Sequence, residues 1–150
     1  MKNLIFDRNS HKASDIIKAK LAENGGRATV YTLQGLPCRI WANADGQSFE
    51  CDKLPITPSY TFDAFDLIVD LLRSQNGRAR KGNGRNYRLG EPNCDETTVV
   101  GMLAQKYNGK KVGDSVFDPV FVFAAVLDWA GIANNERGAL VLTDEYGRKL

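Results

Sequence analysis

The chain has 150 residues, of which 43% are hydrophobic and 25% charged, proportions typical of one globular domain or two small joined ones. This composition excludes collagen-like, coiled-coil and wholly disordered chains, and the length allows a core that needs no disulfide or metal ion. No apolar run reaches the about 18 residues of a membrane span, and residues 1–8 lack the apolar stretch of a secretory signal. We therefore expect a cytoplasmic protein without a membrane partner.

The net charge of +2 is too small to predict a polyanionic partner, but the charge is unevenly distributed. Residues 71–90 contain six basic side chains and no acidic one, which leaves a net charge of −4 on the rest of the chain. The six are Arg73, Arg78, Arg80, Lys81, Arg85 and Arg88. The basic charge is therefore confined to one segment.

The first 54 residues predict a helix followed by three strands. Ser10 or Ser14 can cap the helix, whose apolar residues recur at three- and four-residue spacing until Gly25 and Gly26 end it. Three segments rich in β-branched and aromatic residues follow, at 27–33, 36–42 and 47–54. The short connections between them predict an antiparallel meander.

The second hairpin of this meander allows three registers. A four-residue loop sets Cys38 opposite Cys51, whereas a tighter Asp-Gly turn sets Ile40 opposite Cys51. A type I turn followed by a glycine in the left-handed conformation pairs Trp41 with Phe49 instead. The pattern of residues leaves all three open.

The three cysteines are an odd number in a chain without a secretory signal, which favours reduced thiols. The first register permits a redox-active pair of Cys38 and Cys51, and the alternative is two thiols packed in the core. A zinc site would need all three cysteines and the single histidine, His11, although structural zinc sites usually show close ligand pairs. We therefore expect no metal ion and no cofactor.

The clearest amphipathic helix is predicted at residues 60–74. Its apolar stripe consists of Phe62, Phe65, Ile68, Val69 and Leu72. Asp63, Asp66 and Asp70 follow one another on the opposite side. Such a row could hold a divalent cation, but hard cations prefer ligands that converge from a loop, so we interpret it as a solvated face.

Residues 76–90 contain too few apolar residues for a core element, so we expect a Gly- and Arg-rich loop with one short strand at 86–89. A helix capped by Asn93 follows, with an apolar face over 99–107. A second helix begins at Asp118-Pro119 and is apolar on nearly every side. A hairpin with its turn at 134–138 then closes the chain.

The order of elements from residue 60 onward is helix, short strand, two helices and hairpin. This order resembles the winged helix-turn-helix arrangement. The closing segment, 129–143, is similar to the end of such domains, where a helix leaves through a glycine into a hairpin whose second strand alternates apolar residues. The resemblance is one of pattern order over about 90 residues and carries little information on function.

Winged helices often place the second helix of the motif in the major groove of DNA. The matching helix, 119–130, has no Arg, Lys, Asn or Gln for base edges, which departs from that pattern. Contact with nucleic acid would therefore be made with phosphates, through the loop at 78–88. The predicted phosphate-binding residues are Arg78, Arg80, Lys81, Arg85 and Arg88, to which Lys110, Lys111 and Arg137 can add.

Other chemistries find less support. Residues 11–74 have the element order of double-stranded RNA binding domains, but the start of the last helix is acidic where those domains are basic. The glycine-rich loop lacks the P-loop and dinucleotide-binding patterns, and His11 lies near no nucleophile motif. We therefore expect a protein that is not an enzyme.

These patterns predict an α+β fold. Residues 1–58 would form the N-terminal helix and three-stranded antiparallel meander, and 59–150 a winged-helix-like helical unit with a terminal β-hairpin, packed as one compact unit. The expected core includes Trp41, Phe62, Phe65, Val69, Leu103, Phe121, Phe123 and Leu127. The leading interpretation is a non-enzymatic cytoplasmic protein that binds DNA or another polyanion, and the alternative is a protein-interaction or scaffold module whose basic loop meets an acidic protein surface.

Overall fold

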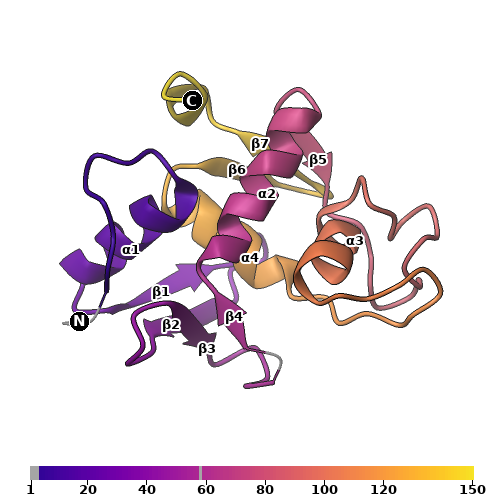
Figure 1. Cartoon of the computed structure of the whole chain (residues 1–150), viewed down its shortest axis with the longest axis horizontal. Coiled ribbons are helices and arrows are strands. Elements are labelled where there is room, and N and C mark those ends of the chain that lie inside the picture. The colour runs from indigo at the N-terminus through magenta and orange to yellow at the C-terminus, as the bar shows by residue number, and fades with distance from the viewer. Residues whose placement is uncertain (1–3, 58) are drawn as a thin grey trace.

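The computed structural model, which describes residues 4–57 and 59–150, has the α+β architecture predicted from the sequence (Figure 1). One antiparallel sheet has the strand order β1-β2-β3-β4, and a second has the order β5-β7-β6. The strands are β1 (Arg27–Tyr31), β2 (Pro37–Ala42), β3 (Ser48–Cys51), β4 (Tyr60–Thr61), β5 (Arg78–Arg80), β6 (Ala133–Glu136) and β7 (Ala139–Leu142). The helices are α1 (Ala13–Glu23), α2 (Asp63–Ser74), α3 (Val99–Met102), the π-helix η1 (Leu103–Tyr107), α4 (Val120–Trp129) and α5 (Asp144–Gly147).

The predicted meander is present and gains a fourth strand. Tyr60 and Thr61 pair with β3 as β4, so α2 begins at Asp63 and not at residue 60 as expected. The N–H of Phe62 donates to the carbonyl of Gln47, 3.0 Å away, which holds this segment against the sheet. Tertiary hydrogen bonding therefore overrides the helical pattern of these first residues.

The β2–β3 register is the one that sets Ile40 opposite Cys51. The loop is held by Asp45, whose carboxylate accepts the backbone N–H groups of residues 47 and 48, and these bonds lower the pKa of Asp45. Cys38 pairs with Val30 on β1 and is not directly opposite Cys51, but the two thiols are diagonal neighbours on the buried face and interact with each other. Burial raises the pKa of both thiols, that of Cys51 to about 11, which disfavours the thiolate that redox chemistry requires.

The prediction of a short strand at 86–89 is wrong, because the structure has no strand there. The strand lies earlier in the chain, at β5. There Ala79 is buried and pairs with Leu140 of β7, and the arginines on either side of it point to solvent. Leu89 instead exchanges backbone hydrogen bonds with the segment after η1, donating to Asp114 at 3.0 Å and accepting from Gly113 at 2.8 Å. The pairing partner of β5 lies some 60 residues away in the sequence, so no local pattern indicates it.

The expected cap at Asn93 is also wrong, because α3 begins only at Val99. Its cap is Thr98, whose Oγ1 accepts the N–H of Gly101 at 3.1 Å. The π-helix η1 then ends at Tyr107, whose ring stacks on Tyr60 with centroids 5.4 Å apart. The Tyr107 hydroxyl accepts the N–H of Thr61 at 2.8 Å, so η1 is tied to the first sheet.

Helix α4 packs between the two sheets and forms the centre of the core (Figure 1). The ring of Phe123 lies 5.7 Å from Phe49, 5.1 Å from Tyr60 and 4.9 Å from Phe65. Buried residues from both halves of the chain belong to one cluster, while the expected boundary at residue 58 lies outside the described residues. Neither α4 nor any other helix in the described ranges is long and apolar enough to cross a bilayer.

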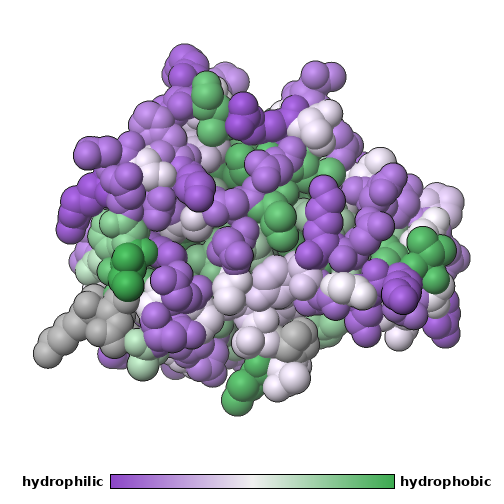
Figure 2. Space-filling model, viewed as in Figure 1, coloured by the Kyte–Doolittle hydropathy of each residue, from purple (hydrophilic) through white to green (hydrophobic). Residues whose placement is uncertain are grey.

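For two of the expected core residues, the prediction of burial is wrong. Trp41 is 38% exposed because it occupies an outward position of β2, and Phe121 is 37% exposed on the side of α4 that neither sheet covers. The other six expected core residues are buried. On the face drawn in Figure 2, hydrophobic side chains form small separate patches on a mostly hydrophilic surface.

Substituting Gly101 tests the packing of α3. A Cβ at this position would lie 1.9 Å from the carbonyl oxygen of Asp95, so backbone must move to admit it. We expect Gly101→Ala to lower the free energy of unfolding by about 1–3 kcal/mol in urea denaturation followed by circular dichroism. The control is Gly147→Ala, where a Cβ meets nothing within 4 Å. Equal stability of the two variants would contradict this packing.

Candidate functional site

The predicted basic residues lie in and beside one lobe, formed by residues 81–98 and 108–118, which we call the basic lobe. These two segments flank α3 and η1 at the right-hand end of the molecule in Figure 1. Although the first segment contains no strand, its backbone is held by hydrogen bonds. Asn83 donates to the carbonyl of Asn93 at 2.7 Å, Leu89 is tied to 113–114 as above, and Leu89 and Cys94 are buried. The Gly- and Arg-rich segment therefore has a defined backbone path.

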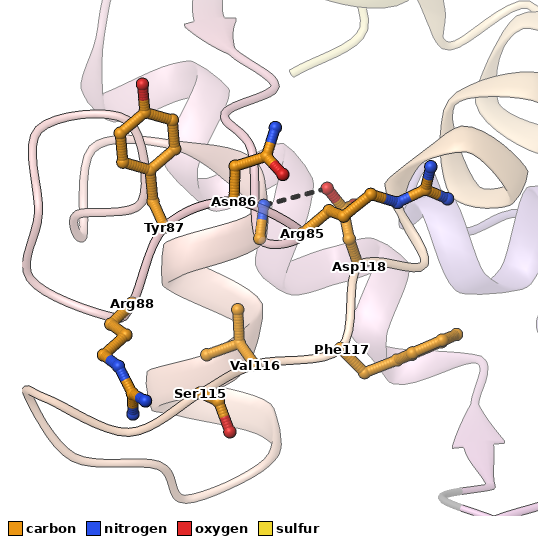
Figure 3. Close-up of a pocket in the computed structure, with 9 residues that line it drawn as sticks. Arg85, Asn86, Tyr87, Arg88, Ser115, Val116, Phe117 and Asp118 are labelled. Atoms are coloured by element: carbon orange, nitrogen blue, oxygen red, sulfur yellow. Dashed lines mark hydrogen bonds between the residues drawn. The ribbon is translucent and has the colours of Figure 1, made fainter.

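Gly84 and Asp118 hold the two segments of the lobe together. The N–H of Gly84 donates to Asp118 Oδ2 at 3.1 Å, the bond drawn as a dashed line in Figure 3. Asp118 Oδ1 accepts the N–H of Val120 at 3.1 Å and so caps α4. A side chain at Gly84 would lie 2.7 Å from Val116, which explains why glycine is required at this contact. The charge of Asp118 is thus directed at backbone N–H groups.

Arg78 and Arg80 lie on the outer face of the second sheet. Ala79 between them is buried, so both arginines point to the opposite, exposed side of β5. Arg78 forms an ion pair with Glu136, at 3.1 Å, and Arg80 donates to the carbonyl of Pro92 at 3.1 Å. Each of these guanidinium groups therefore already has a partner within the protein.

The other three predicted residues line two neighbouring depressions of the surface. The first, of about 420 Å³, is lined by Gly84, Arg85, Asn86, Tyr87, Arg88, Ser115, Val116, Phe117 and Asp118 (Figure 3). The second, of about 520 Å³, is lined by Thr32, Leu33, Gln34, Leu36, Lys81, Arg85, Phe121 and Asn135. Arg85 lines both, while Arg88 lies only in the first and Lys81 only in the second. The structure thus brings Lys81, Arg85 and Arg88 along one surface and leaves Arg78 and Arg80 outside it.

Among these three cations, Arg85 is the one whose side-chain N–H donors have no partner within the described residues. Its guanidinium is exposed and has no hydrogen bond or ion pair with any residue in the described ranges. Arg88 Nη1 donates to the carbonyl of Gly113 at 3.1 Å, and Lys81 Nζ donates to Asn135 Oδ1. Burial lowers the pKa of Lys81. Arg85 is therefore the side chain best able to bind an anion from solution.

Exposed apolar side chains accompany these cations, and sequence reasoning missed them. Phe117, in the first depression, is 40% exposed, and the misassigned Phe121 lies in the second. Leu33 and Leu36 reach the second depression from the loop between β1 and β2, and both are exposed. Because α4 is apolar on nearly all sides, its sequence carries no signal that separates Phe121 from its buried neighbours.

The acidic row of α2 and His11 lie outside the basic lobe. In the part of the chain that the structure describes, no three His, Cys, Asp or Glu side chains are grouped so that they could hold a metal ion. The acidic row of α2 is not wholly solvated, because Asp66 accepts both the N–H and the hydroxyl of Ser14, at 2.9 and 2.6 Å. His11 is exposed, with Nδ1 3.1 Å from the carbonyl of Lys149.

Replacing Asp118 tests the link between the two segments of the basic lobe and α4. Asp118→Ala removes a helix cap and the bond to Gly84, so we expect the free energy of unfolding to fall by about 1–2 kcal/mol. Amide hydrogen exchange at Gly84 should also accelerate, because its N–H loses its acceptor. Asp144→Ala, at the exposed start of α5, is the matched loss of one carboxylate. Unchanged exchange at Gly84 in Asp118→Ala would show that this bond does not hold the lobe.

Comparison with known proteins supplies no relative, since no protein-family model, no curated protein and no solved structure matches this chain. Its function can therefore be inferred only from the surface chemistry of the basic lobe and its surroundings.

Proposed function

We propose that this protein is a non-enzymatic nucleic-acid-associated protein that contacts phosphates through Arg85, with Lys81 and Arg88 on either side. The observation that carries the proposal is the position of Arg85, an exposed, unpaired guanidinium shared by two depressions that each hold one further cation. An arginine of this kind can bind a phosphate through two parallel N–H donors.

Two acidic side chains of the basic lobe, Asp118 and Glu91, accept backbone N–H groups and form no ion pair with Arg85. Asp118 is committed to the N–H groups of Gly84 and Val120, as described above. Glu91 accepts the backbone N–H of Arg88 at 2.6 Å. The N–H donors of the Arg85 guanidinium therefore remain available to an external anion, which supports phosphate contact.

The proposal extends to a winged-helix-like arrangement of the C-terminal half. The order α2, β5, α3 with η1, α4 and the β6–β7 hairpin supports this arrangement. Helix α4, which would then correspond to the base-reading helix, is buried between the sheets and cannot enter a major groove. Binding would therefore depend on phosphates, with strong salt dependence and little sequence preference.

A second candidate function is a protein-interaction module that binds an acidic surface. The observation in its favour is the group of exposed apolar side chains around the second depression, Leu33, Leu36 and Phe121, next to Lys81 and Arg85. Exposed apolar side chains that cluster in this way mark protein interfaces. Binding of a polyglutamate peptide without binding of nucleic acid would favour this candidate.

Fluorescence anisotropy with labelled random-sequence DNA, single-stranded and duplex, tests the proposed function. At low salt we expect Arg85→Ala to weaken binding about tenfold and to reduce the slope of log affinity against log salt by about 1, whereas Arg85→Lys keeps most of the affinity. Arg78→Ala removes the same charge from an existing ion pair and should have a smaller effect.

The matched control for charge is Arg148→Ala, which removes one exposed positive charge near the C-terminus, away from the basic lobe (Figure 1). At about 0.1 M salt, where the Debye length is about 10 Å, we expect its affinity to stay within about twofold of the parent protein, because a charge farther than that from the ligand is screened. Absence of binding to both DNA forms at low salt, or equal losses for Arg85→Ala and Arg148→Ala, would overturn the proposal.

A further inference from the structure

A second cationic and aromatic surface lies on the outward face of the hairpin formed by β1 and β2. Exposed and buried residues alternate along both strands, so every second side chain points to solvent. We call this surface the Trp41 face, and it consists of Arg27, Thr29, Tyr31, Pro37, Arg39 and Trp41. None of these residues belongs to the site predicted from the sequence.

The strand register sets aromatic and basic side chains next to one another on this face. Trp41 is directly opposite Arg27 across the β1–β2 pair, and Arg39 lies two residues before Trp41 on the same side of β2. Trp41 is 38% exposed and Tyr31 61%, so both rings present surface to a ligand. A depression of about 620 Å³ lined by Arg27, Thr29, Arg39 and Trp41, among others, opens at this position.

The charges of the Trp41 face favour an anionic partner on its β1 side. The guanidinium groups of Arg27 and Arg39 have no hydrogen bond or ion pair with any residue that the structure describes. The acidic neighbours lie on the other side, where Glu50 of β3 is paired with Trp41. Asp52 accepts the N–H of Arg39 at 3.0 Å, forms an ion pair with Lys53 at 3.4 Å and also attracts the charge of Arg39, so among the described residues Arg27 is the cation of this face without an acidic partner.

We propose that the Trp41 face binds single-stranded nucleic acid, with bases stacked on Trp41 and Tyr31 and phosphates held by Arg27 and Arg39. Aromatic side chains that alternate with cations on an open surface are the arrangement that recognises unpaired bases, because every base presents a flat π-face. A duplex hides those faces within its own stack, so it can use only the cations. The exposed rings therefore give the Trp41 face a preference for single-stranded over duplex nucleic acid.

The β1–β2 hairpin connects this face to the surface already described. Tyr31 and Pro37 lie at the end of the face, and the loop between them supplies four of the residues that line the second depression beside Arg85. The inference deepens the proposed function, because it specifies the class of nucleic acid. It rests on that function only for the choice of ligand, since its own residues are distinct from Lys81, Arg85 and Arg88.

Intrinsic fluorescence provides a direct readout, because the chain has only two tryptophans. In a Trp129→Phe background Trp41 is the only one, and we expect a single-stranded oligothymidylate to quench its emission, whereas a duplex of equal length does so far less. If Trp129→Phe unfolds the protein, anisotropy of a labelled oligothymidylate with Trp41 variants in the parent background gives the same test.

Substitutions on the face separate stacking from general packing. We expect Trp41→Ala to weaken oligothymidylate binding at least about fivefold, and Trp41→Phe to retain most of the affinity, because a ring is kept. The double variant Arg27→Ala, Arg39→Ala should lower both affinity and salt dependence. The control is Ile56→Ala, which trims a side chain that is 75% exposed and lies outside the face.

The outcomes distinguish the two surfaces. Absence of Trp41 quenching together with unchanged affinity of Trp41→Ala overturns the Trp41 face, even if Arg85→Ala still weakens binding and so upholds the proposed function. Quenching that persists while Arg85→Ala binds like the parent protein upholds the Trp41 face and overturns the role of Arg85. Loss of affinity in both variants supports both surfaces, and equal quenching by duplex and single strand overturns the proposed preference.

Discussion

The packing of α4 is the constraint on which the rest of the structure depends. A helix that is apolar on nearly every side must be covered on nearly every side, and burying each large side chain is worth about 1.5–3 kcal/mol. Here the first sheet covers one side through Phe49 and Tyr60, and the second sheet covers the other through β6. The two halves of the chain therefore share one core.

This central position of α4 determines which surfaces remain for binding. A helix surrounded by both sheets cannot present side chains to a groove, so recognition must come from the periphery. The periphery offers the basic lobe, the β1–β2 hairpin and one position of α4, that of Phe121. The two candidate surfaces meet at the loop of that hairpin, so the proposed binding would bring cations distant in sequence to one extended ligand.

The hydrogen-bond partners of the acidic side chains help to explain how a chain with a net charge of only +2 presents basic surfaces. Asp118, Asp52 and Asp45 each accept backbone N–H groups, and for Asp52 and Asp45 these bonds lower the pKa. Their carboxylate oxygens hold loops in place. The guanidinium groups of Arg27 and Arg85, in contrast, have no hydrogen bond or ion pair with any described residue, so their N–H donors are open to an external anion.

The amino-acid sequence by itself determined the elements that follow from local periodicity and turn chemistry: α1, the three-stranded meander, α2 apart from its start, α4 after Asp118-Pro119 and the terminal hairpin. It also located the basic segment. Only the tertiary structure decided that β5 pairs with β7, that Trp41 and Phe121 face solvent, and that Arg85 lies apart from the occupied Arg78 and Arg80. Each of these depends on residues far apart in the chain, since a side chain's exposure and the partner of its charge are set by what the fold brings against it.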